Sequence, residues 1–241
     1  MLVGTAGVRV DRPLGQVALT VSLVAATLAA HWAAAIRGHA VACAVAAGVF
    51  YYGGNALVCA RRVNVRLRAR FGATTAVRAH EVFLGVAFAN QALAITATAA
   101  VGRGELPLPA GVGLAAGAVL TVVGAVTKYW ATALTGLDVY YYRDLFLRRR
   151  LGTLVTKGPY HKLRHPMYGL GNAHAYAPAL AAGSVVGLLV AFAYHVAIYA
   201  FLFAVEKPFV ARLVARERLD AGAATGVPRV VSRAAAATPP G

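Results

Sequence analysis

Charged residues are scarce in this sequence. Asp, Glu, Lys and Arg make up 13% of the chain, whereas a soluble domain usually carries about 25%. None of the four occurs from Pro166 to Val205, and 59% of all residues are hydrophobic. Apolar stretches of roughly 20 residues recur, which is the length of a helix that crosses a bilayer. The composition therefore argues against a soluble domain and predicts an all-α, polytopic membrane protein.

Acidic residues are the scarcer of the two charged kinds. Eight Asp and Glu stand against 24 Lys and Arg, which gives a formal net charge of +16. The basic residues gather between the apolar stretches, where they mark cytoplasmic loops and attract anionic lipid headgroups. No basic element of a nucleic-acid-binding fold accompanies them. We therefore expect the lipid bilayer, and no nucleic acid, as the partner of these charges.

Cysteine is almost absent. Cys43 and Cys59 fall in one predicted helix, about 24 Å apart at a rise of 1.5 Å per residue, so they cannot form a disulfide. Neither has a His or Cys neighbour at zinc-binding spacing, and no other group of His, Cys, Asp and Glu has it. We expect two buried thiols and no metal site.

The apolar stretches predict about six transmembrane helices. They cover residues 16–36, 41–60, 82–101, a span from Ala110, and two short spans within 166–205 that are joined near Gly183–Ser184. The loops after the second and fourth spans are the most basic, so we expect both termini in the cytoplasm. The opening residues lack the pattern of a cleavable signal peptide, and we expect none.

The densest polar cluster lies at 158–169, just before the uncharged run. It reads Gly-Pro-Tyr-His-Lys-Leu-Arg-His-Pro-Met-Tyr-Gly, and its prolines and glycines favour an irregular, fixed backbone. Ionisable groups at a membrane boundary are costly without partners, so the cluster predicts a functional site. An interfacial belt of Tyr, Arg and Lys is the alternative, and we favour it for Lys162 alone. The residues assigned to the site are Tyr160, Arg164, His165 and Tyr168.

A lone carboxylate, Glu206, follows the uncharged run. It could accept hydrogen bonds from a ribose or an amine, or it could mark the membrane boundary and pair with Lys207. The aromatic run 140–142 could surround a sulfonium or methylated ammonium by cation–π attraction, although an interfacial belt explains it as well. His174 lies close enough to the polar cluster to line a pocket.

These residues together resemble a known family. Gly158-Pro-Tyr160, followed by Arg164-His165-Pro166-Met-Tyr168-Gly169, resembles the signature of integral-membrane methyltransferases. That group includes isoprenylcysteine carboxyl methyltransferases and phospholipid N-methyltransferases. Two further stretches resemble the phospholipid branch. They are Thr135-Gly136 with Tyr142-Arg143-Asp144-Leu-Phe146, and Glu206-Lys207-Pro208-Phe209. In the second stretch Lys207 stands where the family has the second glutamate of a Glu-Glu pair.

The resemblance implies S-adenosylmethionine as methyl donor, S-adenosylhomocysteine as product, and a cytosol-facing cofactor pocket near the C-terminal half. It implies N-methylation of a phosphatidylethanolamine-type headgroup. Carboxyl methylation of an isoprenylcysteine-like or other lipophilic acid stays open, as does a non-catalytic transporter or scaffold. Carried over by position, the cofactor-binding residues are Gly158, Pro159, Tyr160, Arg164, His165, Pro166, Tyr168, Gly169 and Glu206.

An amine must lose a proton before it attacks the donor, so the site needs a base. The candidates, which the sequence does not rank, are His165, Glu206, His161 and Asp144. The lipid phosphate needs cations nearby, and the candidates for the headgroup are Arg143, Tyr141, Arg148 and Lys162. We expect three N-terminal spans in 1–109, a methyltransferase core in 110–233 and a disordered tail in 234–241.

Overall fold

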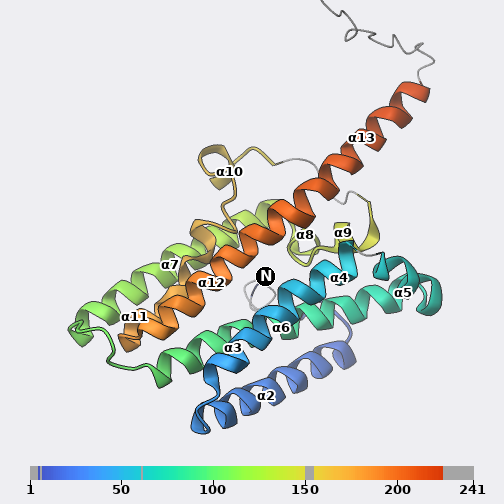
Figure 1. The fold of residues 1–241 in the computed structure, drawn as a ribbon. Coiled ribbons are helices and arrows are strands. Elements are labelled where there is room, and N and C mark those ends of the chain that lie inside the picture. The colour runs from blue at the N-terminus through green and yellow to red at the C-terminus, as the bar shows by residue number, and fades with distance from the viewer. Residues whose placement is uncertain (1–4, 6, 61, 150–154, 225–241) are drawn as a thin grey trace, which may run out of the picture.

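The computed structural model describes residues 5, 7–60, 62–149 and 155–224 of the chain. Within these residues every regular element is a helix and no strand occurs (Figure 1). Five helices are long and apolar enough to cross a membrane. They are Leu14–Ile36, Ala40–Cys59, Ala73–Val101, Gly111–Thr135 and Val185–Ala215. The predicted all-α, polytopic membrane architecture is confirmed.

The N-terminal half is arranged around one long helix, α6. Its elements are α2 (Leu14–Ile36), α3 (Ala40–Gly48), the π-helical η1 (Val49–Gly53), α4 (Gly54–Ala60), α5 (Val63–Phe71) and α6 (Ala73–Val101). The α3, η1 and α4 segments are continuous and form one crossing. Helix α6 packs against α2, α3 and α5. It starts before the predicted residue 82 because neighbouring segments cover its first polar turns, where His80 and Glu81 are buried.

In the C-terminal half, one of the predicted membrane spans is not a single helix. Its long and intermediate elements are α7 (Ala110–Thr135), the 3₁₀-helical η2 (Leu170–Tyr176), α11 (Ala177–Ala182), α12 (Val185–Phe201), the π-helical η3 (Leu202–Glu206) and α13 (Lys207–Ala224). The first of the two spans predicted within 166–205 is therefore η2 followed by α11. Irregular backbone is tolerated at membrane depth where protein covers it, and both segments pack along α7.

Glycines of α7 allow η2 and α11 to lie directly on its backbone. A Cβ atom at Gly124 would collide with the backbone nitrogen of His174, and one at Gly117 with the carbonyl oxygen of Ala177. Small residues permit this kind of contact between helices where lipid is the solvent. The glycine face of α7 therefore fixes the position of η2 in the middle of the bundle.

Two turns meet at one end of the bundle. The Leu106 N–H donates to the carbonyl oxygen of Gly183 at 2.7 Å. Gly183 has a φ of +63°, which glycine adopts without strain, and the Ser184 hydroxyl caps α12 by accepting from the Gly187 N–H at 3.0 Å. The predicted break at Gly183–Ser184 is confirmed.

The opposite end of the bundle carries the short helices. Helix α7 ends at Thr135 because Gly136 turns the chain with a φ of +90°. The short helices are α8 (Leu137–Tyr140), α9 (Arg143–Leu147) and α10 (Pro159–Lys162). Figure 1 shows α4, α5 and the start of α13 at this same end. Residues 225–233 of the predicted core and the predicted tail 234–241 lie outside the described residues.

Candidate functional site

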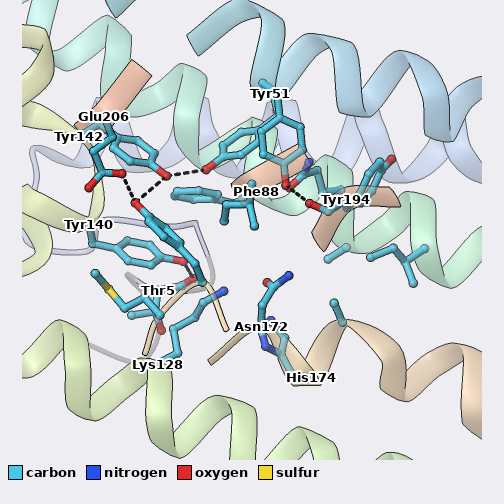
Figure 2. Close-up of a pocket in the computed structure, with 18 of the residues that line it drawn as sticks. Thr5, Tyr51, Phe88, Lys128, Tyr140, Tyr142, Asn172, His174, Tyr194 and Glu206 are labelled. Atoms are coloured by element: carbon cyan, nitrogen blue, oxygen red, sulfur yellow. Dashed lines mark hydrogen bonds between the residues drawn. The ribbon is translucent and has the colours of Figure 1, made fainter. Parts of the chain in front are cut away.

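A cavity of about 340 Å³ lies between the two halves of the bundle (Figure 2). Its volume is within the range of small-molecule sites. Aromatic and aliphatic side chains form most of the wall, and a few polar groups interrupt them. The polar and aromatic residues of the wall include Thr5, Tyr51, Phe88, Lys128, Tyr140, Tyr142, Tyr168, Asn172, His174 and Glu206.

A chain of hydrogen-bonded phenols ends on the carboxylate of Glu206. The Tyr168 hydroxyl donates to Glu206 Oε2 at 2.5 Å. The hydroxyl oxygens of Tyr168 and Tyr142 are 3.3 Å apart, and those of Tyr142 and Tyr51 are 3.5 Å apart. Each phenol carries one proton, so all three bonds form only if the donors run Tyr51 to Tyr142 to Tyr168 to Glu206. This direction places three hydroxyl dipoles in series toward one carboxylate.

Irregular backbone presents these side chains to the cavity. Glu206 ends the π-helical η3, and Tyr51 lies in the π-helical η1. Single π-turns inserted in α-helices occur frequently at functional sites. Tyr142 has a φ of +50°, a conformation that is uncommon and strained for a residue with a side chain. Three unusual backbone segments, distant in sequence, therefore converge on one side of the cavity.

The loop at 158–169 orients Tyr168 into the cavity. Pro166 is fully buried, and its carbonyl oxygen accepts from the Gly171 N–H at 2.7 Å. The His165 carbonyl oxygen accepts from the Tyr168 and Gly169 N–H groups at 3.2 and 2.9 Å. These bonds close a turn between the loop and η2. The prolines and glycines of the motif thus fix the conformation of the backbone that carries Tyr168.

The same loop rests on the end of α7. Gly158 has a φ of +61°, and a Cβ atom there would collide with side-chain atoms of Leu134 and Trp130. Pro159 is buried and begins α10. Tyr160 lies within electrostatic reach of Glu206, and its partial burial raises the pKa of its phenol. These motif residues do not line the cavity.

The most polar residues of the loop point elsewhere. His161, Lys162 and Arg164 are exposed. His165 is half-buried and does not line the cavity, and its ring centroid lies 6.5 Å from that of Tyr199 and 6.4 Å from that of Phe203. Partial burial and two nearby cations, on Lys207 and Arg164, lower the pKa of His165. Of the residues that the sequence assigned to the site, Tyr168 and Glu206 line the cavity.

Asp144 lies beside the cavity rather than in its wall. Its Oδ1 accepts from the Leu145 N–H at 2.9 Å, and its charge acts on Glu206. Burial raises the pKa of the Asp144 carboxyl to about 6. Asp144 is therefore a second carboxylate that can exchange a proton near neutral pH.

The residues predicted to bind the lipid headgroup do not form part of the cavity wall. Arg143 pairs with Asp138 at 2.7 Å. Tyr141 is fully buried beneath the guanidinium of Arg9, which lies 5.3 Å from its ring centroid. Arg148 has a φ of +55° and follows the end of α9. None of the three lines the cavity.

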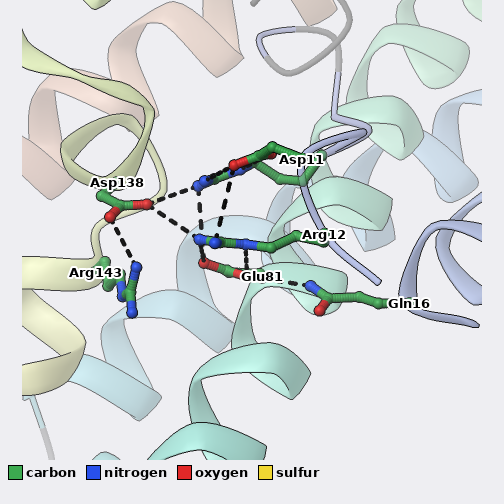
Figure 3. Close-up of polar contacts among 7 residues, drawn as sticks. Asp11, Arg12, Gln16, Glu81, Asp138 and Arg143 are labelled. Atoms are coloured by element: carbon green, nitrogen blue, oxygen red, sulfur yellow. Dashed lines mark hydrogen bonds and ion pairs between the residues drawn. The ribbon is translucent and has the colours of Figure 1, made fainter. Parts of the chain in front are cut away.

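An N-terminal segment, residues 7–13, is attached to α6 and α8 by ion pairs (Figure 3). Arg12 binds the buried carboxylate of Glu81 through two hydrogen bonds of 2.9 and 2.6 Å. Arg9 pairs with Asp138 at 2.9 Å and with Asp11 at 2.6 Å. These pairs connect the segment that precedes α2 to two elements distant in the chain.

Thr5, two residues before this segment, reaches the cavity. The Tyr140 hydroxyl donates to the carbonyl oxygen of Thr5 at 2.9 Å, and Thr5 lines the cavity. Cβ atoms at Gly7 and Gly85 would each collide with the other residue's carbonyl oxygen, so the segment crosses α6 in backbone contact. The sequence reasoning missed this contribution. The only signal for it is the charged triplet of Arg9, Asp11 and Arg12 next to an apolar span.

Lys128 is another residue that sequence reasoning missed. It lies within the candidate span of α7 and lines the cavity with Asn172 and His174. A lysine inside an apolar span is by itself a signal of function. The described residues contain no group of three or more His, Cys, Asp and Glu that could hold a metal ion.

The C-terminal half of the chain is similar to known proteins. Residues 112–217 match the family model described as phospholipid methyltransferase. A phosphatidylethanolamine N-methyltransferase of Schizosaccharomyces japonicus is 37% identical over 99 residues, which are 41% of this chain and 11% of that protein. One from Laccaria bicolor is 43% identical over 72 residues, 30% of this chain and 8% of that protein. The matched stretches thus span about a tenth of these relatives' length, and no solved structure matches.

Proposed function

We propose that this chain, whose residues 112–217 belong to the phospholipid methyltransferase family, transfers a methyl group from S-adenosylmethionine to the amine of a phosphatidylethanolamine-type lipid. The family match confirms the resemblance that the motifs around Tyr168 and Glu206 predicted. The observation that carries the proposal is the cavity in which both residues meet.

The residues present fit a sulfonium nucleoside. The wall offers the rings of Tyr51, Phe88, Tyr140 and Tyr142, whose faces attract a cation. Glu206 adds a carboxylate that can balance the positive charge or accept a hydrogen bond from a ribose hydroxyl. When bound, the donor supplies a methyl group already activated on sulfur. The protein's own task is to align two reactants and exclude water.

The transfer forms a nitrogen–carbon bond and breaks a carbon–sulfur bond, and the amine releases a proton. Glu206 is the carboxylate in the cavity wall. Its Oε2 is held by Tyr168, while Oε1 has no hydrogen-bond partner among the described residues. We assign proton acceptance to Oε1, because a base must lie within hydrogen-bond reach of the amine. Asp144, nearby and with a raised pKa, is the second candidate.

Methyl transfer by membranes that contain the chain tests this proposal. With methyl-labelled S-adenosylmethionine, we expect label in base-stable phospholipid. Glu206→Gln should lower the rate by about 100-fold or more, the usual contribution of a positioned base. Tyr168→Phe should lower it by about 10-fold, because a hydrogen bond to a charged group contributes about 1.5 kcal/mol or more. Tyr129→Phe, which removes an exposed phenol of α7, is the control and should leave the rate unchanged.

The other outcomes of this experiment are equally informative. Label in a base-labile ester would show carboxyl methylation instead. No label in any lipid, from a protein that is inserted and folded, would favour a non-catalytic membrane protein. Full activity of both Glu206→Gln and Tyr168→Phe would place the chemistry outside the cavity.

A further inference from the structure

The cavity contains a cation for which the described part of the protein supplies no counter-charge. Lys128 lies seven residues before the end of α7, which at 1.5 Å per residue is about 10 Å inside the span. Its ammonium makes no hydrogen bond or ion pair with any described residue, and Figure 2 shows its side chain directed into the cavity. An isolated charge at this depth is costly unless it meets a partner. Its surroundings therefore favour a bound anion.

The other carboxylates whose side chains the structure describes form no ion pair with Lys128, and Asp144 accepts from the Leu145 N–H. Glu81, Asp138 and Asp11 belong to the N-terminal ion pairs. Glu105 accepts from the Val186 N–H at 3.0 Å at the far end of the bundle. Glu206 shares the cavity with Lys128 but forms no ion pair with it. The positive end of the cavity is thus distinct from its acidic, phenol-lined end.

A neutral donor accompanies Lys128. The Asn172 side chain reaches the same part of the cavity (Figure 2) and has no hydrogen-bond partner among the described residues. Gly171 allows this position, because a Cβ atom there would press on the backbone of Lys128 and collide with the carbonyl oxygen of Pro166. An ammonium and an amide N–H₂ on adjacent elements can hold two oxygens of one anion.

His174 completes the local arrangement as an acceptor. Its Nδ1 lies 2.9 Å from the carbonyl oxygen of Gly171. A carbonyl can only accept, so Nδ1 carries the proton and the neutral ring presents Nε2 as an acceptor. A hydrogen-bond acceptor at Nε2 can face the ammonium of Lys128, but it cannot donate to an anion. Binding of the anion is left to Lys128 and Asn172.

We propose that Lys128 and Asn172 form the subsite for the phosphodiester of the lipid acceptor, an inference that rests on the proposed function. In the headgroup the phosphodiester lies two carbons from the amine, so it must bind a short distance from the reacting nitrogen. The cavity wall also includes Ala92, Ile95 and Pro178, which suit acyl chains. The phenols and Glu206 at the other end suit the methyl donor and the amine.

Acceptor kinetics test the assignment. We compare phosphatidylethanolamine with a long-chain alkylamine, which carries the amine without a phosphate. Lys128→Met should raise the KM for phosphatidylethanolamine at least 10-fold, and leave the KM for S-adenosylmethionine and the kinetics with the alkylamine within twofold. Lys128→Arg should recover most of the loss. Lys157→Met, which removes an exposed charge outside the cavity, is the matched control.

A second variant separates ligand binding from folding. Asn172→Asp places a carboxylate beside Lys128 and so supplies the missing counter-charge from within the protein. It should raise the melting temperature and also raise the KM for phosphatidylethanolamine at least 10-fold. A purely structural role for Lys128 would raise the melting temperature and leave this KM unchanged, which would overturn the proposal.

Binding without the methyl donor separates this proposal from the function it rests on. A short-chain phosphatidylethanolamine, titrated by calorimetry, should bind wild-type protein at least 10-fold more tightly than Lys128→Met. That result would support the subsite even if no methyl transfer were detected. Equal binding by the two proteins would overturn it, and so would a Lys128→Met defect confined to the KM for S-adenosylmethionine, since the anion would then be the donor's carboxylate.

Discussion

Glu206 and Lys128 mark two ends of one cavity, and each is a charged residue within an apolar candidate span. The proposed binding mode places a zwitterionic headgroup between them, with its amine toward the carboxylate and its phosphate toward the ammonium. Tyr168 fixes one oxygen of Glu206 and leaves the other for chemistry. Few residues therefore determine both orientation and proton transfer in the proposed reaction.

Asp144 supplies a prediction on pH and stability. Its carboxyl pKa is raised from 3.8 to about 6 in the folded protein, so the folded state binds the proton more tightly than the unfolded state. The fold therefore loses stability as pH rises from about 4 to 6, by roughly 2–3 kcal/mol at most. Asp144→Asn keeps the acceptor for the Leu145 N–H and should remove this loss.

Thermal unfolding of the purified protein between pH 4 and 8 measures this effect. The melting temperature of Asp144→Asn should exceed that of wild type at pH 8, and the difference should shrink as pH falls below 6. A difference that does not change with pH would show that the carboxylate is not destabilised by burial.

At the residue scale, sequence reasoning could identify side chains whose neighbours are close in the chain or whose isolation is conspicuous. Tyr168 lies in a dense motif, and Glu206 ends the long uncharged run. Tyr51 and Asn172 carry no such signal, because their role depends on helices that meet only in three dimensions. Arg164 was predicted from the density of the same motif, and its side chain is exposed and does not line the cavity.

At the scale of elements, the long helices were predictable because every backbone polar group in lipid must be satisfied within its own segment. Lengths of apolar stretches therefore gave α2 and α7 within a few residues. The broken passage of η2 and α11 was not predictable, because its backbone is covered by α7 rather than by its own regular bonds. The π-turns in η1 and η3 depend on tertiary packing in the same way.

The N-terminal segment yields a prediction about stability. Glu81 is nearly fully buried and is paired with Arg12. Removing one partner of a buried ion pair costs up to about 3–5 kcal/mol, and without Arg12 the carboxylate of Glu81 keeps a longer contact with Arg9, at 3.7 Å, and a hydrogen bond from Gln16. Arg12→Met should therefore lower the melting temperature clearly, whereas Arg37→Met, in the exposed turn after α2, should not.

A double-mutant cycle measures the coupling between the two residues. The Arg12→Met/Glu81→Gln protein should melt at a higher temperature than Arg12→Met alone, because the buried carboxylate that lost its closest cation is no longer charged. Additive effects of the two substitutions would contradict the importance of this pair.

At the scale of the whole molecule, we propose that the end with α5 and α8–α10 faces the cytoplasm, together with both termini. Exposed Lys162 and Arg164 at this end, and the arginines of α5, follow the positive-inside pattern. The turn 102–109 would then face the other side. The cavity wall near Glu206 is formed close to the basic end, where a soluble methyl donor could enter.

Cysteine labelling in oriented vesicles tests this topology. Cys43 and Cys59 are free, as predicted, and both can be replaced by alanine. A membrane-impermeant thiol reagent should then modify Lys162→Cys from the cytoplasmic side and Arg103→Cys from the opposite side. Labelling of both positions from one side would contradict the proposed arrangement.

The central claim is that the cavity between the two halves binds the methyl donor at Glu206. Calorimetric titration with S-adenosylhomocysteine measures this without any lipid acceptor. We expect saturable binding by wild type and by Tyr129→Phe, and at least 10-fold weaker binding by Glu206→Gln at unchanged melting temperature. Equal affinity of wild type and Glu206→Gln, or no binding by folded wild-type protein, would contradict the account.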